Sequence, residues 1–173
     1  YTAADGSYRF ELNLFTTNLD HLIEFDYASY TFQNVGSADI DGAELAAGVL
    51  LGADTRLQGQ ITWLHTEDAN GDDLLRRPSL SGSVTLSGRL GLERLRGDLT
   101  LVYVGHRDDI DPVTFGRITA GGFATADLAL AYRVLPALEL TLRVQNLADR
   151  DYEMVAGYPS PGRRFIGGLR ASF

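Results

Sequence analysis

The chain has 173 residues, contains no cysteine and carries 15 basic against 23 acidic residues, a net charge of −8. The absence of cysteine excludes disulfide bonds, a thiol nucleophile and a cysteine-based zinc site. The negative charge, with arginine as the one basic residue type besides histidine, argues against a nucleic-acid partner, whose phosphates would need neutralising. No stretch approaches the roughly 20 apolar residues of a spanning helix, and none has the pattern of a signal peptide. The chain does not begin with methionine, so we expect a mature or excised piece.

Alternation of apolar and polar residues runs through most of the chain. In residues 79–92, for example, Ser83 and Thr85 fall on one side of an extended chain while Val84 and Leu86 fall on the other. This period of two is typical of strands, and no segment has a convincing helical period. The predicted strands are residues 7–19, 22–32, 38–51, 56–67, 79–92, 98–106, 122–134, 138–144 and 164–173.

The predicted connections alternate in length. Short links near residues 20, 53, 94 and 135 alternate with longer polar ones near 35, 72, 114 and 155. An antiparallel meander with short turns at one rim, long loops at the other and one apolar face is typical of an outer-membrane barrel. Lipid cannot hydrogen-bond a sheet edge, so such a sheet must close. The predicted fold class is therefore all-β, an antiparallel up-and-down transmembrane β-barrel meander of about nine strands.

A soluble β-sandwich binding domain also alternates and is the main alternative fold. Two features favour the barrel. The polar faces contain a Ser/Thr ladder and arginines, which a sandwich core would not bury. Aromatic residues such as Trp63, Tyr103 and Tyr132 also lie near predicted strand ends, where a membrane interface would be.

The end of the chain resembles a known signature. Residues 146–153 (NLADRDYE), the following Gly157-Tyr158-Pro159 and a terminal Phe173 are similar to the C-terminal signature of TonB-dependent receptors. Residues 161–163, 75–78, 103–109 and the segment from 34 to 44 also resemble that family, most closely its cobalamin receptor branch. The resemblance covers nearly the whole chain.

The resemblance implies a fold and a function. Receptors of this family are 22-stranded barrels in the bacterial outer membrane, plugged by an N-terminal domain that binds the TonB energising complex. They take up scarce metal chelates such as cobalamin or a ferric siderophore. No segment here resembles the plug or its TonB-binding motif, so residues 1–173 are expected to be the C-terminal portion of the barrel domain, without the plug. An odd count of nine strands would place the two ends on opposite rims.

The same resemblance implies the partners. They are outer-membrane lipid, the receptor's own plug, the TonB complex reached through that plug, a small chelate ligand and the barrel assembly machinery, which would read Phe173. A passive outer-membrane pore or structural barrel is the alternative function. No enzyme activity and no cofactor are expected, and a hydrolytic set built on His21, His65 or His106 is disfavoured because His21 and His65 are placed at opposite rims.

Few residues suggest a site. Asp108, Asp109 and Asp111 are candidate ligands for a hard cation such as calcium, although a solvated loop of like charges is the favoured interpretation, so no metal site is predicted. Three arginines on predicted inward faces, Arg143, Arg164 and Arg170, are candidates for contact with the plug or an anionic ligand. Tyr152 and Tyr158, in the last long loop, are candidates for contact with the ligand.

Overall fold

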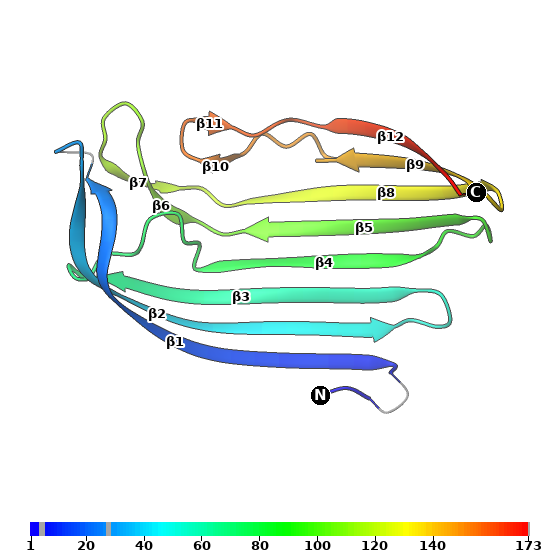
Figure 1. Cartoon of the computed structure of the whole chain (residues 1–173), viewed down its shortest axis with the longest axis horizontal. Coiled ribbons are helices and arrows are strands. Elements are labelled where there is room, and N and C mark those ends of the chain that lie inside the picture. The colour runs from blue at the N-terminus through cyan, green and yellow to red at the C-terminus, as the bar shows by residue number, and fades with distance from the viewer. Residues whose placement is uncertain (4–5, 27–28, 173) are drawn as a thin grey trace.

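One large antiparallel sheet makes up most of the chain. The computed structural model describes residues 1–3, 6–26 and 29–172, and within them no helix is long and apolar enough to cross a membrane. The sheet has eight strands, each beside its neighbour in the chain except where the small hairpins of two loops intervene (Figure 1). In order across the sheet these are β1 (Tyr8–Asp26), β2 (Thr31–Leu50), β3 (Arg56–Asp68), β4 (Leu80–Arg89), β5 (Leu95–Val104), β8 (Phe123–Leu135), β9 (Leu138–Gln145) and β12 (Arg164–Ala171).

Two long loops contain short hairpins of their own. Strands β6 (Arg107–Ile110) and β7 (Arg117–Ala120) pair in the loop between β5 and β8, and β10 (Glu153–Val155) pairs with β11 (Tyr158–Pro159) in the loop between β9 and β12. Both hairpins lie at the end of the sheet where the long loops gather (Figure 1). Residues 51–55, 90–94 and 136–137 form the short turns at the opposite end.

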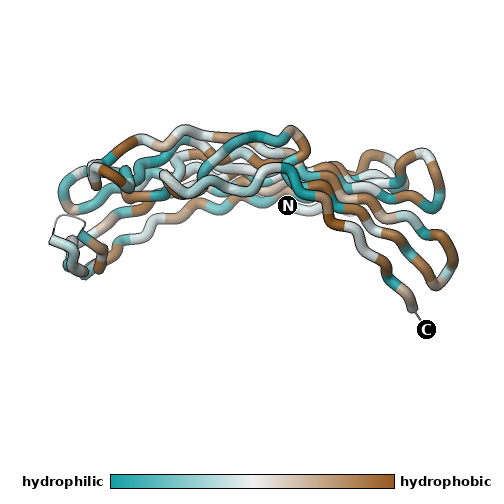
Figure 2. The backbone as a smooth tube through the Cα atoms, turned by 90° about the horizontal axis from the view of Figure 1, so that it is seen from above, coloured by the Kyte–Doolittle hydropathy of each residue, from teal (hydrophilic) through white to brown (hydrophobic). Residues whose placement is uncertain are grey.

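Each strand sorts its side chains by face. Along β5, Leu99 and Leu101 lie on the face that also carries Leu86 of β4 and Leu128 of β8, because these residues are paired across the sheet. Thr85, Thr100 and Asp127 share the other face by the same pairings. The hydroxyl oxygens of Thr85 and Thr100 are 3.0 Å apart. Figure 2 shows the resulting alternation of hydrophilic and hydrophobic residues along a bowed sheet. The large side chains of the apolar face are exposed in this chain, as expected of a face that lipid covers.

The first two predicted strands are one strand. The sequence predicts a short link at residues 20–21, but β1 continues through them to Asp26, and the pairing with β2 shifts register between Asp20 and Leu22. His21 has φ 61° and the opposing Gly36 has φ 90°, which mark a β-bulge. A polar dipeptide in a strand that extends beyond β3 therefore bends the strand without ending it. The resulting hairpin curls at its outer end (Figure 1).

Eight strands change the expected position of the chain ends. The start of β1 and the end of β12 both lie at the short-turn end of the sheet, so the expectation of opposite rims is wrong (Figure 1). Strands β1 and β12 are the two edges of an open sheet. A single large sheet with no second sheet packed on it in the described part of the chain also contradicts the sandwich alternative.

The buried residues are concentrated at one end. An open sheet encloses no apolar core, and the apolar buried side chains are few. Apart from glycines, every buried residue among those described lies in or beside the long loops: Ala38, Thr66, Leu74, Arg107, Asp109, Phe123, Val144, Asn146 and Ala156. The tightest packing of the chain is therefore at its long-loop end.

Candidate functional site

Asp109 joins the three long loops. It lies on β6 and its side chain is 0% exposed. One carboxylate oxygen, Oδ1, accepts hydrogen bonds from Nε of Arg76 at 2.9 Å and from the amide of Ile110 at 2.8 Å. The other, Oδ2, accepts the amide of Ala156 at 2.8 Å. Arg76 belongs to residues 69–79 and Ala156 to residues 146–163, so one carboxylate connects two other loops.

Arg107 holds the β10–β11 hairpin through two hydrogen bonds to its backbone. It is 4% exposed, and its Nη2 donates to the carbonyl oxygens of Glu153 and Met154 at 2.6 and 2.7 Å. Its guanidinium also lies 5.9 Å from the ring centre of Phe123. A guanidinium presents several donors in a fixed plane, which suits it to bridge two carbonyls at once.

Asp108 and Asp111 have separate partners. Asp108 accepts a hydrogen bond from Nη1 of Arg117 at 2.7 Å, and the same nitrogen donates to the carbonyl of Asp73 at 2.8 Å. Burial alone would lower the pKa of Arg117, but the hydrogen bond to Asp108 and the nearby carboxylates raise it. Asp111 accepts the amides of Thr114 and Val113, which lower the pKa of its carboxyl group.

The three candidate cation ligands, Asp108, Asp109 and Asp111, thus accept hydrogen bonds from different partners. Within the described residues no group of three or more His, Asp or Glu side chains is arranged to hold a metal ion. The interpretation of this loop as solvated is wrong for Asp109, whose side chain is fully buried beside the guanidinium of Arg76. We call the residues that tie the loops together the loop network: Arg76, Arg107, Asp108, Asp109, Arg117, Phe123, Tyr152 and Ala156.

The loop network should depend on pH through Asp109. Burial raises the pKa of this carboxyl group, but the amides of Ala156 and Ile110 and the guanidinium of Arg76 together lower it below its ordinary value of 3.8. A lowered pKa in the folded state means that the stabilisation is complete above the ordinary value and is lost as the pH falls through the folded value. We expect the Ala156 amide to lose protection from hydrogen exchange, relative to its intrinsic rate, below about pH 4. An Asp109→Asn variant should lack this acid transition, and an identical transition in that variant would contradict the assignment.

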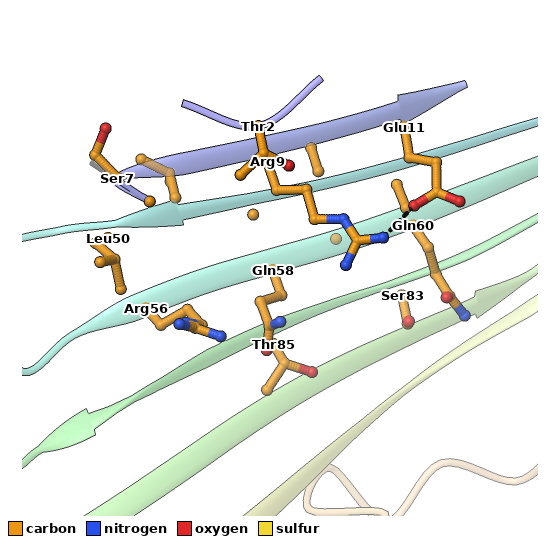
Figure 3. A pocket seen from close by; sticks show the side chains of 16 residues that line it. Thr2, Ser7, Arg9, Glu11, Leu50, Arg56, Gln58, Gln60, Ser83 and Thr85 are labelled. Atoms are coloured by element: carbon orange, nitrogen blue, oxygen red, sulfur yellow. Dashed lines mark hydrogen bonds and ion pairs between the residues drawn. The ribbon is translucent and has the colours of Figure 1, made fainter. Parts of the chain in front are cut away.

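The polar face of the sheet is hollowed near the short-turn end. A cavity of about 630 Å³ opens there between β1, β2, β3 and β4. Figure 3 shows side chains of β1, β3 and β4 converging on it, and Arg9 and Glu11 form an ion pair of 2.6 Å. Its polar lining includes Arg9, Glu11, Arg56, Gln58, Gln60, Ser83 and Thr85.

The three predicted wall arginines share the polar face of β9 and β12. Arg164 donates to Gln145 at 2.8 Å and Arg170 to Glu139 at 3.2 Å, both across the strand pair. Arg143 is exposed, and the described part of the chain gives it no hydrogen bond or ion pair. Exposed pairs of this kind contribute little to stability.

The two predicted loop tyrosines have different surroundings. The ring of Tyr152 lies 4.4 Å from that of Phe123 and is half-buried in the loop network. Tyr158, on β11, is 68% exposed. Phe173, the predicted assembly signal, lies outside the described residues.

The histidines do not form a catalytic set in the described part of the chain. His21 lies in the bulge of β1, at the long-loop end, so its placement at the short-turn rim is wrong. A ring nitrogen of His21 is 3.4 Å from the side chain of Asn34, and His65 is 3.9 Å from Glu67. His106 is exposed.

Sequence reasoning missed the arginines of the loop network. Arg76, Arg107 and Arg117 were not proposed as site residues, although Arg76 and Arg107 lie in the segments 75–78 and 103–109 that resemble the receptor family. That resemblance was the one available signal, because the partners of Asp109 are 33 and 47 residues away in the chain.

A comparison with family models decides the identity. The model described as "TonB dependent receptor-like, beta-barrel" matches residues 1–147. The chain belongs to the TonB-dependent receptor family. Members of this family are β-barrel proteins of the bacterial outer membrane, and the family comprises receptors and transporters rather than enzymes.

Individual proteins resemble this chain in sequence or in fold. The chain is 27% identical over 150 residues to the vitamin B12 transporter BtuB of Vibrio cholerae serotype O1, covering 85% of this chain and 24% of the transporter. The ferric-catecholate import receptor Fiu of E. coli K12, in its closed form, matches with a TM-score of 0.78 and 21% identity over 100% of this chain and 26% of Fiu. The ferripyoverdine receptor of Pseudomonas aeruginosa gives 0.81 and 17% over 99% of this chain and 26% of the receptor. The chain therefore spans about a quarter of the length of these relatives, and the two structural likenesses show the shared fold.

Proposed function

We propose that this chain is the C-terminal portion of the barrel of an active outer-membrane importer for a scarce metal chelate, cobalamin or a ferric siderophore. The observation that supports it most is the family match over residues 1–147, together with 27% identity to a vitamin B12 transporter. In this proposal the apolar face contacts lipid, the polar face lines the lumen, and the long loops surround the ligand entrance.

The proposal assigns roles to the wall and loop residues. Arg143, Arg164 and Arg170 contact the carboxylates of a plug domain that is not among residues 1–173, and the TonB complex acts through that plug. Tyr158, as the exposed tyrosine of the β10–β11 hairpin, contacts the chelate, while Tyr152 supports the hairpin from within. Phe173 is read by the barrel assembly machinery. No nucleic-acid partner, metal site or cofactor is part of the proposal.

The negative charge of the long-loop end favours some classes of chelate over others. Residues 18–41, 65–79, 105–122 and 146–163, which make up the long-loop end, contain 15 acidic and 6 basic residues, a net charge of −9, whereas the remainder has +1. A field of one sign at an entrance concentrates ligands of opposite charge, repels those of like charge and leaves neutral ligands unaffected. This distribution supports a neutral or cationic chelate, such as a corrinoid, over a multiply negative ferric catecholate.

The test is ligand binding by the receptor that contains this chain. Purified in detergent, it should bind cyanocobalamin or a ferric siderophore with a Kd in the micromolar range or below, measured by tryptophan fluorescence quenching or calorimetry. Failure with both ligand classes would overturn the proposal.

Conductance separates the importer from a passive pore. A plugged importer in a planar bilayer should show no steady open conductance. A large, constant conductance would favour the passive pore.

A further inference from the structure

The long loops are connected to one another more closely than the strand order requires. Neighbouring strands of a barrel would hold each loop at its own two ends, and the loops could then move separately. Here the buried polar residues form contacts from loop to loop. We infer that Asp109, Arg107 and Arg76 are positioning residues that make the three long loops one cooperative unit and thereby hold the β10–β11 hairpin in place at the ligand entrance.

Asp109 is the centre of this unit. Its two carboxylate oxygens accept from a side chain of residues 69–79 and from the amide of Ala156 in residues 146–163. The backbone adds a second link to the first of these loops, since the amide of Arg76 donates to the carbonyl of Asp108 at 2.7 Å. A buried carboxylate with these donors cannot lose one without leaving a polar group unsatisfied, so the contacts should break together.

The hairpin is held at two further points. Arg107 binds the carbonyls of Glu153 and Met154, which belong to β10. At the turn, Gly157 has φ 79° and lies so close to Pro112 that a Cβ placed there would stand 2.5 Å from the ring of the proline. Glycine therefore lets the turn of one loop lie against the turn of the next.

Arg117 connects residues 105–122 with residues 69–79. Through one nitrogen it joins Asp108 of its own loop to the carbonyl of Asp73. Residues 69–79 are thus held to residues 105–122 by Arg76 and by Arg117, at two separate places. Among the contacts described, Asp109 is the one side chain that hydrogen-bonds both the hairpin and residues 69–79, which makes this carboxylate the residue to change.

Hydrogen exchange of the ligand-free receptor tests the unit directly. In Asp109→Asn, an amide nitrogen replaces one carboxylate oxygen and faces a donor. We expect exchange to become at least about tenfold faster both at residues 154–157 and at residues 74–77, with strands β4, β5 and β8 unchanged. Asp111→Asn is the matched control, because the hydrogen bonds that the carboxylate of Asp111 accepts in the described residues come from Val113 and Thr114 of its own turn. It should affect residues 111–116 alone.

Two outcomes would overturn the inference. One is an Asp109→Asn effect confined to residues 107–112, and the other is an equal spread of effects in Asp111→Asn. Should Asp109→Asn fail to assemble, Arg76→Leu removes one donor and keeps the buried carboxylate, and it should raise exchange at residues 154–157, which it does not touch. Arg76→Lys, which keeps a cationic donor, should restore protection at those residues. No change at residues 154–157 in Arg76→Leu would likewise overturn the inference.

Ligand binding gives a second test, which rests on the proposed function, whereas the hydrogen-exchange test does not. If Tyr158 contacts the chelate, Asp109→Asn should weaken binding about tenfold at unchanged heat-modifiability of the barrel on gels, while Asp111→Asn should bind as wild type. A receptor that binds none of the chelates removes the proposed function but leaves the exchange result to decide on the loop unit. Wild-type affinity in Asp109→Asn, in a receptor that does bind, would refute the positioning role.

Discussion

Leu99→Arg should destabilise the barrel by about 2–4 kcal/mol, because it places a charge on the lipid face near the middle of the membrane. Leu99 is the fifth residue of the ten-residue β5, and its side chain lies between Leu86 and Leu128 on the apolar face. The measurement is the free energy of unfolding in denaturant for the receptor folded into lipid vesicles.

The neighbouring position provides the control. Thr100→Arg introduces the same side chain one residue further along β5, on the polar face and opposite Asp127. There the guanidinium would meet water and a carboxylate, so the free energy of unfolding should change by less than about 1 kcal/mol. Equal losses in the two variants would mean that the faces are assigned incorrectly.

Removing negative charge from the long-loop end should speed the capture of anionic chelates. The triple variant Asp72→Asn, Asp73→Asn and Asp151→Asn changes three exposed carboxylates, none of which has an ion pair in the described part of the chain. At low ionic strength we expect the association rate of a ferric catecholate to rise about tenfold, and the gain to shrink as salt screens the field. Association of cyanocobalamin, which is neutral, should stay the same. Stopped-flow fluorescence of the receptor would measure both rates.

A charge-matched control separates a local field from net charge. Asp54→Asn, Glu93→Gln and Asp98→Asn remove the same number of charges at the short-turn end, far from the entrance. This variant should leave both association rates near those of the wild type. An equal acceleration by the two triple variants would show that the position of the charge does not matter.

The wall of the barrel was predictable because its signal is local. The alternation of Leu99 and Leu101 with Thr100 is visible within a few residues, and it determines both the strand and the face. The prediction failed where a local signal had two explanations. Asp20-His21 has the composition of a turn, yet the same residues can form a bulge within a long hairpin, and only the pairing with residues 36–37 distinguishes the two.

The contacts at the long-loop end, unlike the strands of the wall, were not predictable from local sequence. Three aspartates within four positions predict a solvated, self-repelling loop when only neighbours in sequence are considered. In the structure Asp109 is buried because Arg76 and the Ala156 amide reach it from loops that begin and end on other strands. No spacing within residues 105–122 encodes those partners.

By itself the sequence determined the strand faces, the acidic charge of the long-loop residues and the membership suggested by residues 146–163, since each is a property of short segments. The tertiary structure decided the number of wall strands and the grouping of the long loops into one unit. The physical reason is that strand register and buried ion pairs depend on which distant segments meet, and that is settled only when the whole sheet is paired.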